Sequence, residues 1–312
     1  MNYMQHVNAM LRNSVAAVPE LVIFGQNVSA GSCIGGLTRG LTVTPGSRIL
    51  NTQNSEGTLA GVGFGLMLRG VSSVLCLKQQ DFLLLSLDHL VNTYNVVRRL
   101  KSDTASFTIL LVVVDQGFDG PQSCLNNLDD FCSMAHVPGY VMHNGHDVEK
   151  IINTHLVAPG FRILCVSQRL AGTELLRLEG PVETTPDGAV FRYARGTEAT
   201  VVACNFAFPQ ALAVWNHLQD HAVQASLFSV NAMDATEWHW IREDLQRTRK
   251  LVLLDDSKSG NRMSDRLLWA MREAGVVDRA VLHRRDFSPA WFRPNPDLLE
   301  VDPAEILRQL QS

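Results

Sequence analysis

The carboxylate of Glu56 is a candidate for catalytic chemistry because of its position in the sequence. It follows the polar run 51–55 and opens a helical pattern, residues 57–68, that is apolar on all sides. Three glycines fall within 61–65, although a glycine inside a helix costs about 1 kcal/mol. Close packing of another backbone would explain them, and a buried helix that begins with a lone carboxylate places the acid at a domain or subunit junction. An ordinary helix-start glutamate, favoured by the macrodipole, explains the same position. The residues alone leave both interpretations open.

Other chemical patterns in the chain are weaker. The glycine-rich stretch 31–40 is followed by extended residues rather than a helix, which favours a flexible loop over a phosphate site. The ten histidines form no H-E-x-x-H, and each is interpreted as structural. The six cysteines form no C-x-x-C pair, and they are predicted to be buried free thiols. We therefore expect no metal site built by this chain.

The composition narrows the class of protein. Of the 312 residues, 46% are hydrophobic and 19% are charged, and that charged share lies below the roughly 25% usual for soluble domains. The deficit indicates that a partner covers part of the surface. With 27 basic and 31 acidic side chains, a nucleic-acid partner is not expected. The longest unbroken apolar run, 109–114, is far short of the about 20 residues of a membrane span. No signal peptide is visible, so a cytoplasmic protein without a membrane partner is expected.

Short apolar runs alternate with helical patterns along the whole chain. This alternation predicts an α/β fold with mainly parallel sheets covered on both faces. The expected strands are 21–24, 71–77, 107–114, 140–143, 162–166, 199–205, 224–230, 250–255 and 279–283. The expected helices are 57–69, 84–100, 125–135, 147–154, 209–220, 236–247, 262–274 and 303–310.

A stretch rich in turn-forming residues divides the two series of strands. Residues 180–188 read Gly-Pro-Val-Glu-Thr-Thr-Pro-Asp-Gly, and the Pro-Asp-Gly turn is expected to close a small hairpin. We therefore predict one domain over residues 1–180 and a smaller one over residues 195–312.

The start of the glycine-containing helix resembles a known family. Asn-Ser-Glu-Gly at 54–57, with Ala-Gly-Val-Gly-Phe-Gly at 60–65 and Arg-Gly-Val at 69–71, resembles the β subunits of thiamine diphosphate-dependent 2-oxo acid dehydrogenases. It is similar, more distantly, to the C-terminal half of transketolases. The resemblance continues through 21–25, 80–82, 87–92, 137–141, 147–150, 199–203 and 250–256. It implies two doubly wound domains, a pyrimidine-binding domain followed by a transketolase C-terminal-type domain.

The resemblance also implies a cofactor, thiamine diphosphate, and roles for three residues. Glu56 matches the catalytic glutamate that hydrogen-bonds a pyrimidine ring nitrogen and promotes the imino tautomer. Phe82 matches the aromatic residue that stacks on the pyrimidine, and the 26 residues between the two are the family's own spacing. Asp88 falls where some members carry an acidic residue linking active sites, a candidate proton relay.

Half of such a site is missing from the sequence. The family binds diphosphate and Mg²⁺ with a Gly-Asp-Gly…Asn segment, and no Gly-Asp-Gly occurs here. The resemblance therefore implies an α-type partner subunit that supplies the Mg²⁺ and diphosphate ligands, in an α2β2 heterotetramer.

The chain also departs from the family's pattern near the substrate. Asn126 stands where the family has a histidine near the reacting carbon, and Gln26 and Asn27 replace paired acids after the first strand. The residues that activate the cofactor are retained, so activation is better supported than the acceptor step.

The resulting expectation is the β-type subunit of a heteromeric enzyme. It would decarboxylate a pyruvate-like 2-oxo acid and pass the acyl or hydroxyalkyl unit to an acceptor such as a lipoyl or carrier protein. One alternative is the C-terminal component of a split transketolase that transfers a ketol unit. A second, of another class, is a non-catalytic regulatory homologue, against which the retention of Glu56 and Phe82 argues.

Overall fold

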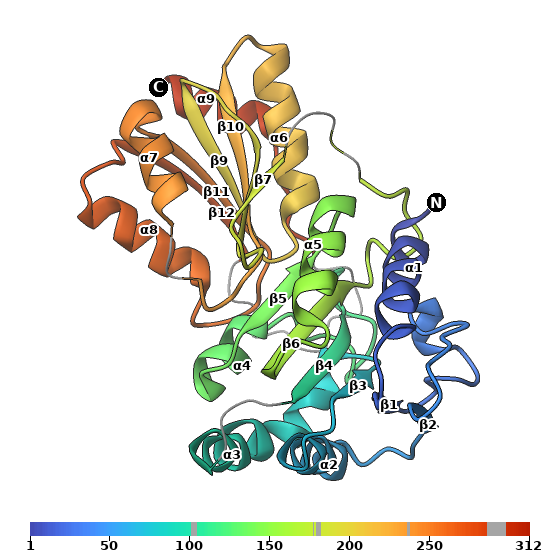
Figure 1. Cartoon of the computed structure of the whole chain (residues 1–312). Helices are drawn as coiled ribbons and strands as arrows, with labels where there is room; N and C mark the ends of the chain where they lie inside the picture. The colour runs from blue at the N-terminus through green and yellow to red at the C-terminus, as the bar shows by residue number, and fades with distance from the viewer. Residues whose placement is uncertain (101–104, 177, 179–181, 236–237, 286–297) are drawn as a thin grey trace.

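The computed structural model describes residues 1–100, 105–176, 178, 182–235, 238–285 and 298–312. These residues form two six-stranded sheets, the second above the first in Figure 1, with helices on both faces of each. The predicted fold class, α/β with two doubly wound sheets, is confirmed. In the part of the chain that is described, no helix is both long and apolar enough to cross a membrane.

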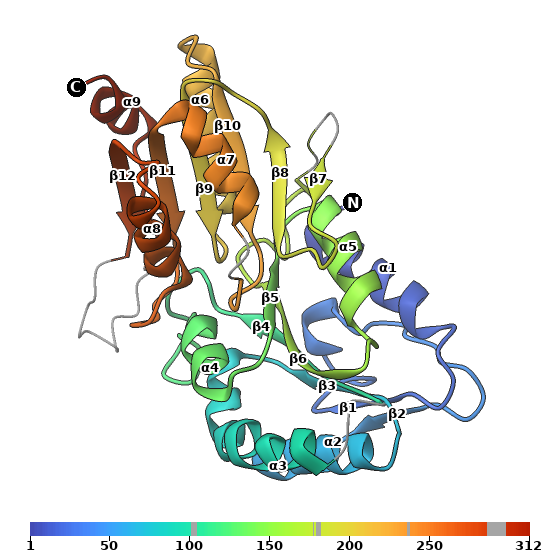
Figure 2. The ribbon, with the colours of Figure 1, turned by 60° about the vertical axis from the view of Figure 1, so that its left-hand side comes forward.

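The first sheet is entirely parallel. Its strands, in spatial order, are β2 (Arg48–Asn51), β1 (Val22–Gly25), β3 (Ser73–Leu77), β4 (Ser106–Val113), β6 (Gly160–Ser167) and β5 (Gly139–Met142). One face carries α2 (Glu56–Leu68), the 3-10 turn η2 (Gln80–Ser86), the π-helical turn η3 (His89–Thr93), α3 (Tyr94–Leu100) and α4 (Leu128–Ala135). The other face carries α1 (Tyr3–Val15) and α5 (Gly145–His155), which pack together (Figure 2).

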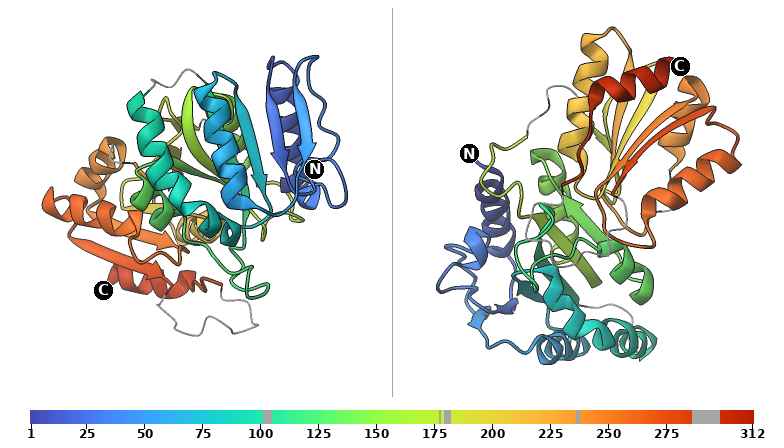
Figure 3. Two further views of the ribbon diagram at one scale, coloured as in Figure 1. Left: turned by 90° about the horizontal axis from the view of Figure 1, so that it is seen from below. Right: turned by 180° about the vertical axis from the view of Figure 1, so that it is seen from behind.

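The second sheet is mainly parallel, with an antiparallel hairpin at one edge. Its order is β12 (Arg279–Arg284), β11 (Lys250–Asp255), β9 (Ala199–Cys204), β10 (Ala225–Val230), β8 (Val190–Ala194) and β7 (Glu183–Thr184). Helices α6 (Phe208–Asp220) and α9 (Pro303–Gln311) lie on one face, and α7 (His239–Thr248) and α8 (Met263–Glu273) lie on the other (Figure 3).

Most of the predicted elements are present. All nine expected strands form, and the Pro-Asp-Gly turn closes the β7–β8 hairpin. The helix expected over 84–100 is instead broken into the end of η2, the turn η3 and α3, and residues 236–237 of another expected helix lie outside the described residues. Strand β2 and helix α1 were not predicted. The domain limits stay a prediction. Strands β7 and β8 precede residue 195 yet join the second sheet.

An aromatic cluster holds α2 on the first sheet. The Phe64 ring lies 4.9 Å from that of Phe107 on β4 and 5.0 Å from that of Phe161 on β6. Gly63, on the same side of α2, is needed for this approach because a Cβ there would lie 2.2 Å from the Phe107 ring. Gly65 faces away from the sheet, and a Cβ there would meet nothing within 4 Å. The glycines of α2 therefore do not share one role.

The two sheets are joined through β5, an edge strand of the first. Residues 231–233, which follow β10, run antiparallel to it. The Val141 nitrogen donates to the Asn231 oxygen (2.9 Å) and the Met233 nitrogen to the Gly139 oxygen (2.8 Å). The edge that β5 would otherwise expose is thereby paired with the second domain.

Gly63 and Gly65 of α2 give a matched pair of substitutions. Gly63→Ala should lower the free energy of unfolding by about 1–3 kcal/mol, because the added methyl group overpacks against Phe107. Gly65→Ala should raise it by up to about 1 kcal/mol, because alanine favours the helix at no steric cost. Urea unfolding of both variants measures the difference. Equal effects of the two substitutions would contradict the packing described here.

Candidate active site

Glu56 begins α2 and is 6% exposed. Ser86, at the end of η2, donates from its hydroxyl to the Glu56 backbone oxygen (2.9 Å), which fixes the first turn of the helix against η2. Among the residues that the structure describes, no hydrogen bond or ion pair reaches the Glu56 carboxyl group. The residue is largely covered, but neither carboxyl oxygen is among the buried polar atoms without a partner, so the carboxyl group keeps contact with solvent and is open to a ligand.

Phe82 lies on η2, the turn that packs beside the first turn of α2. The two elements approach so closely that a Cβ on Gly57 would lie 3.0 Å from the Leu85 oxygen. Phe82 is half-buried, and Asp88, six residues further on, is exposed and accepts from the Asn92 side chain (2.8 Å). The structure therefore brings the elements of Glu56 and Phe82 together and leaves the Asp88 carboxylate at the surface.

Residues beside Phe82 hold the loop that follows β4. The Asp81 carboxylate accepts from the backbone nitrogens of Cys124 (3.1 Å) and Leu125 (3.2 Å), and Gln80 Oε1 accepts from the Asn127 nitrogen (2.8 Å). Burial, aided by the neighbouring Asp81, raises the pKa of the Cys124 thiol to about 11, so this thiol stays protonated. No sequence pattern indicates this contact, because its partners lie more than forty residues apart.

Asn126, at the position of the family's histidine, is fully buried and forms hydrogen bonds through its side chain and its backbone oxygen. Its Nδ2 donates to the Asp256 oxygen (2.9 Å), and its Oδ1 accepts from Asn205 Nδ2 (2.8 Å). Its backbone oxygen accepts from the Lys258 nitrogen (2.8 Å). All three partners belong to the second domain, so Asn126 joins the domains and is not available for proton transfer.

Arg169 links two buried carboxylates at the same junction. Its Nε lies 3.2 Å from Asp115 Oδ2, and its Nη2 lies 3.6 Å from Asp256 Oδ2. Burial raises the pKa of Asp256 to about 7, although the charges of Arg169 and then Arg285 oppose the shift. The carboxyl ends of strands from both sheets meet here, which is where open α/β sheets bind ligands.

The other residues and segments considered in the sequence do not form a functional site at this junction in the described structure. Gln26 and Asn27 are exposed after β1, and the glycine-rich stretch contains only the 3-10 turn η1 (Ile34–Gly36), with no helix N-terminus to receive a phosphate. All six cysteines are free thiols, five buried and Cys33 half-buried. The described residues contain no cluster of three or more metal-ligating side chains.

Similarity in sequence to known proteins identifies relatives of this chain. No family model matches. The chain is 20% identical over 265 residues to the acetoin:2,6-dichlorophenolindophenol oxidoreductase subunit beta of Cupriavidus necator, covering 80% of this chain and 78% of that protein. It is 21% identical over 257 residues to the pyruvate dehydrogenase E1 component subunit beta of Leifsonia xyli subsp. xyli, covering 80% and 75%. These names confirm the resemblance to dehydrogenase β subunits.

Solved structures define the fold. A split-gene transketolase, described as an inactive beta4 tetramer, superimposes with a TM-score of 0.72 at 12% identity, over 100% of this chain and 97% of that one. The transketolase of Campylobacter jejuni gives a TM-score of 0.63 at 11% identity, over 92% of this chain and 42% of that one. The chain therefore has a transketolase-like fold.

Asp129, a further buried acid at the junction, predicts a pH dependence of stability. Asp129 on α4 accepts from the Met263 nitrogen of the second domain (3.1 Å), and burial, with a smaller contribution from Asp255, raises its pKa. The folded protein therefore keeps a proton that the unfolded chain loses above about pH 4, and stability falls as the pH rises toward the folded pKa. Asp129→Asn cannot ionise and retains an oxygen for Met263.

The free energy of unfolding of Asp129→Asn, relative to wild type, should therefore rise between about pH 5 and pH 8, at up to about 1.4 kcal/mol per pH unit. Urea unfolding of both proteins at several pH values measures it. Asp256 is present in both proteins, so its titration cancels. A stability difference that stays constant with pH would contradict the raised pKa.

Proposed function

We propose that this chain is the β-type subunit of a heteromeric thiamine diphosphate enzyme and contributes the pyrimidine half of the active site. The observation that carries the proposal is the secluded carboxyl group of Glu56, without a partner in the described residues, at the helix start beside η2. The names of the relatives support the enzyme class.

The residues fit the pyrimidine ring of that cofactor. When bound, thiamine diphosphate would supply the carbanion chemistry of 2-oxo acid decarboxylation. Glu56 would receive a hydrogen bond from the pyrimidine ring and hold a proton there, since a secluded carboxylate makes a strong charge-assisted bond to a protonated ring. Phe82, on the adjacent η2, would stack on the ring. Asp88 remains a proposal for a proton relay at the surface.

A partner would complete the site. The sequence has no Gly-Asp-Gly segment, so an α-type subunit would provide the ligands for Mg²⁺ and diphosphate. Large apolar side chains are exposed on α2 and η2 around the candidate site: Val62 (46%), Leu84 (54%) and Leu85 (65%). Such a surface is typical of a protein interface. We propose an α2β2 heterotetramer, located in the cytoplasm.

The proposed reaction is decarboxylation of a 2-oxo acid and transfer of the acyl or hydroxyalkyl unit to an acceptor, such as a lipoyl or carrier protein. Because Asn126 is committed to the domain junction, a proton for the acceptor step would come from the partner subunit or the substrate. Ketol transfer by a split transketolase is the second candidate, and the superposition over 100% of this chain and 97% of the split-gene transketolase favours it.

Glu56→Gln tests the activating role. In the complex assembled with the α-type subunit, the variant should fold and assemble but exchange the thiazolium proton about 10²–10⁴-fold more slowly, the usual contribution of a general acid–base group. Exchange of that proton into deuterated buffer, followed by NMR, measures the rate. Glu273→Gln, at an exposed residue of α8, is the matched control. A wild-type rate in assembled Glu56→Gln would contradict the assignment and favour the regulatory alternative.

A further inference from the structure

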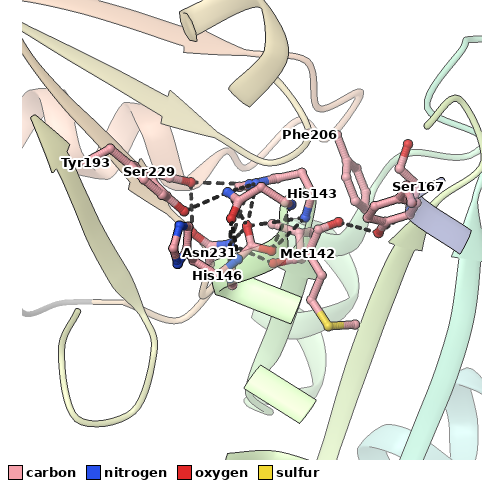
Figure 4. A network of polar contacts seen from close by, with 12 residues as sticks. Met142, His143, His146, Ser167, Tyr193, Phe206, Ser229 and Asn231 are labelled. Carbon is pink, nitrogen blue, oxygen red and sulfur yellow. Dashed lines mark hydrogen bonds and ion pairs between the residues drawn. The ribbon is translucent and has the colours of Figure 1, made fainter. Parts of the chain in front are cut away.

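A buried polar network lies where β5 meets the second domain (Figure 4). At its centre is His143, whose Nδ1 lies 2.5 Å from Asp147 Oδ2 and whose Nε2 lies 3.2 Å from Ser229 Oγ. The imidazole also stacks on the Phe208 ring of α6, with centroids 5.0 Å apart and planes 7° apart. The Ser–His–Asp order is that of a catalytic triad, but all three residues are 0% exposed. The arrangement therefore needs another explanation.

The hydrogens of the network can be assigned by counting donors and acceptors, beginning with Asn231. Its Nδ2 lies 2.8 Å from the Val141 oxygen and 3.1 Å from Asp147 Oδ2. Both of these oxygens accept, so both amide hydrogens are used and the orientation of the amide is fixed. Asn231 Oδ1 can then only accept, and its donor in the described structure is the Ser229 hydroxyl at 2.8 Å.

Asp147 acts only as an acceptor. Besides the imidazole and Asn231, its carboxylate receives the backbone nitrogens of His143 (3.0 Å) and Asn144 (3.0 Å) and the side-chain amide of Asn144 (3.0 Å). So many donors stabilise the charged form. The nitrogen of His143 that faces this carboxylate must therefore carry a hydrogen.

The other ring nitrogen must carry one too. Ser229 has a single hydroxyl hydrogen, and that hydrogen goes to Asn231 Oδ1, so Ser229 Oγ can only accept from His143 Nε2. A neutral ring would leave Asn231 Oδ1 without its donor, or would leave Nε2 with only the 3.5 Å contact from Asn231 Nδ2, although that amide is committed at shorter distances to the Val141 oxygen and Asp147 Oδ2. We propose that His143 is held as a doubly protonated imidazolium, and that its sealed ion pair with Asp147 positions the second domain on β5.

Two buried phenols around the ring are neutral. Tyr193 of β8 accepts from Asn144 Nδ2 (2.7 Å), and Tyr3 of α1 donates to the Met142 oxygen (2.6 Å). Burial raises the pKa of both phenols well above the ordinary value, so neither is ionised. The imidazolium thus balances the Asp147 carboxylate, and His143 is a positioning residue at the domain junction.

Long-range ¹H–¹⁵N correlation NMR of the full chain, labelled in histidine, tests the proposal. Both ring nitrogens of His143 should resonate in the protonated range at about pH 7–8, where an unperturbed histidine is neutral. His143→Gln assigns the signals by their loss. His146→Gln is the matched control, since it removes a half-buried histidine three residues away and should leave the His143 signals in place. One His143 nitrogen in the unprotonated range would overturn the proposal.

Ser229→Ala provides the assignment should His143→Gln fail to fold. It removes the acceptor of Nε2 together with the donor to Asn231 Oδ1, so the Nε2 resonance should move while both nitrogens stay protonated through the pair with Asp147. An Nε2 resonance that does not move, or that shifts into the unprotonated range, would overturn the proposed hydrogen-bond order.

Discussion

The pairing of β5 with residues 231–233 is the constraint on which the rest of the structure depends. It turns an edge strand of the first sheet into a joint with the second, through backbone bonds at Val141 and Met233. Strand ends of the two domains then meet across it, and Asn126 and Arg169 form their cross-domain contacts there. Side chains of this joint are buried, so their polar groups must find partners within it.

Those contacts explain why the candidate site lies elsewhere. Polar groups at the joint are mostly paired with each other, as Asn126 and His143 show. The Glu56 carboxyl group is different, since no hydrogen bond or ion pair from the described residues reaches it and its oxygens keep contact with solvent. It lies at the start of α2, near apolar side chains of η2 that face solvent. A carboxyl group without a protein partner beside an exposed apolar surface is what half of a shared site would present.

The sequence predicts the strands well because parallel strands buried on both faces read as continuous apolar runs. Strand β2 is not predicted, because it is an exposed edge strand without a continuous apolar run. Helix α1 has a usable signal in the sequence, a capping box of Asn2 and Gln5, although it is absent from the predicted elements. The apolar pattern of residues 84–100 does not indicate that η3 interrupts the expected helix.

Part of the candidate site could likewise be predicted from the sequence, and part could not. Glu56 and Phe82 could be named because a local motif and a fixed spacing carry them, and their roles stay proposals. The role of Asn126 could not be predicted, since its partners lie 79 and 130 residues away. The proposed protonation of His143 depends on Ser229 and Asn231, 86 and 88 residues away, and only the folded chain shows that geometry.

Calorimetric titration with thiamine diphosphate and Mg²⁺ tests the central claim, that this chain holds half of a shared site. The chain alone should show no tight binding, and binding should appear when the α-type subunit is added, because Mg²⁺ bridges protein oxygens and phosphates that this chain cannot link by itself. Micromolar affinity of the isolated chain, about −8 kcal/mol, would contradict the account.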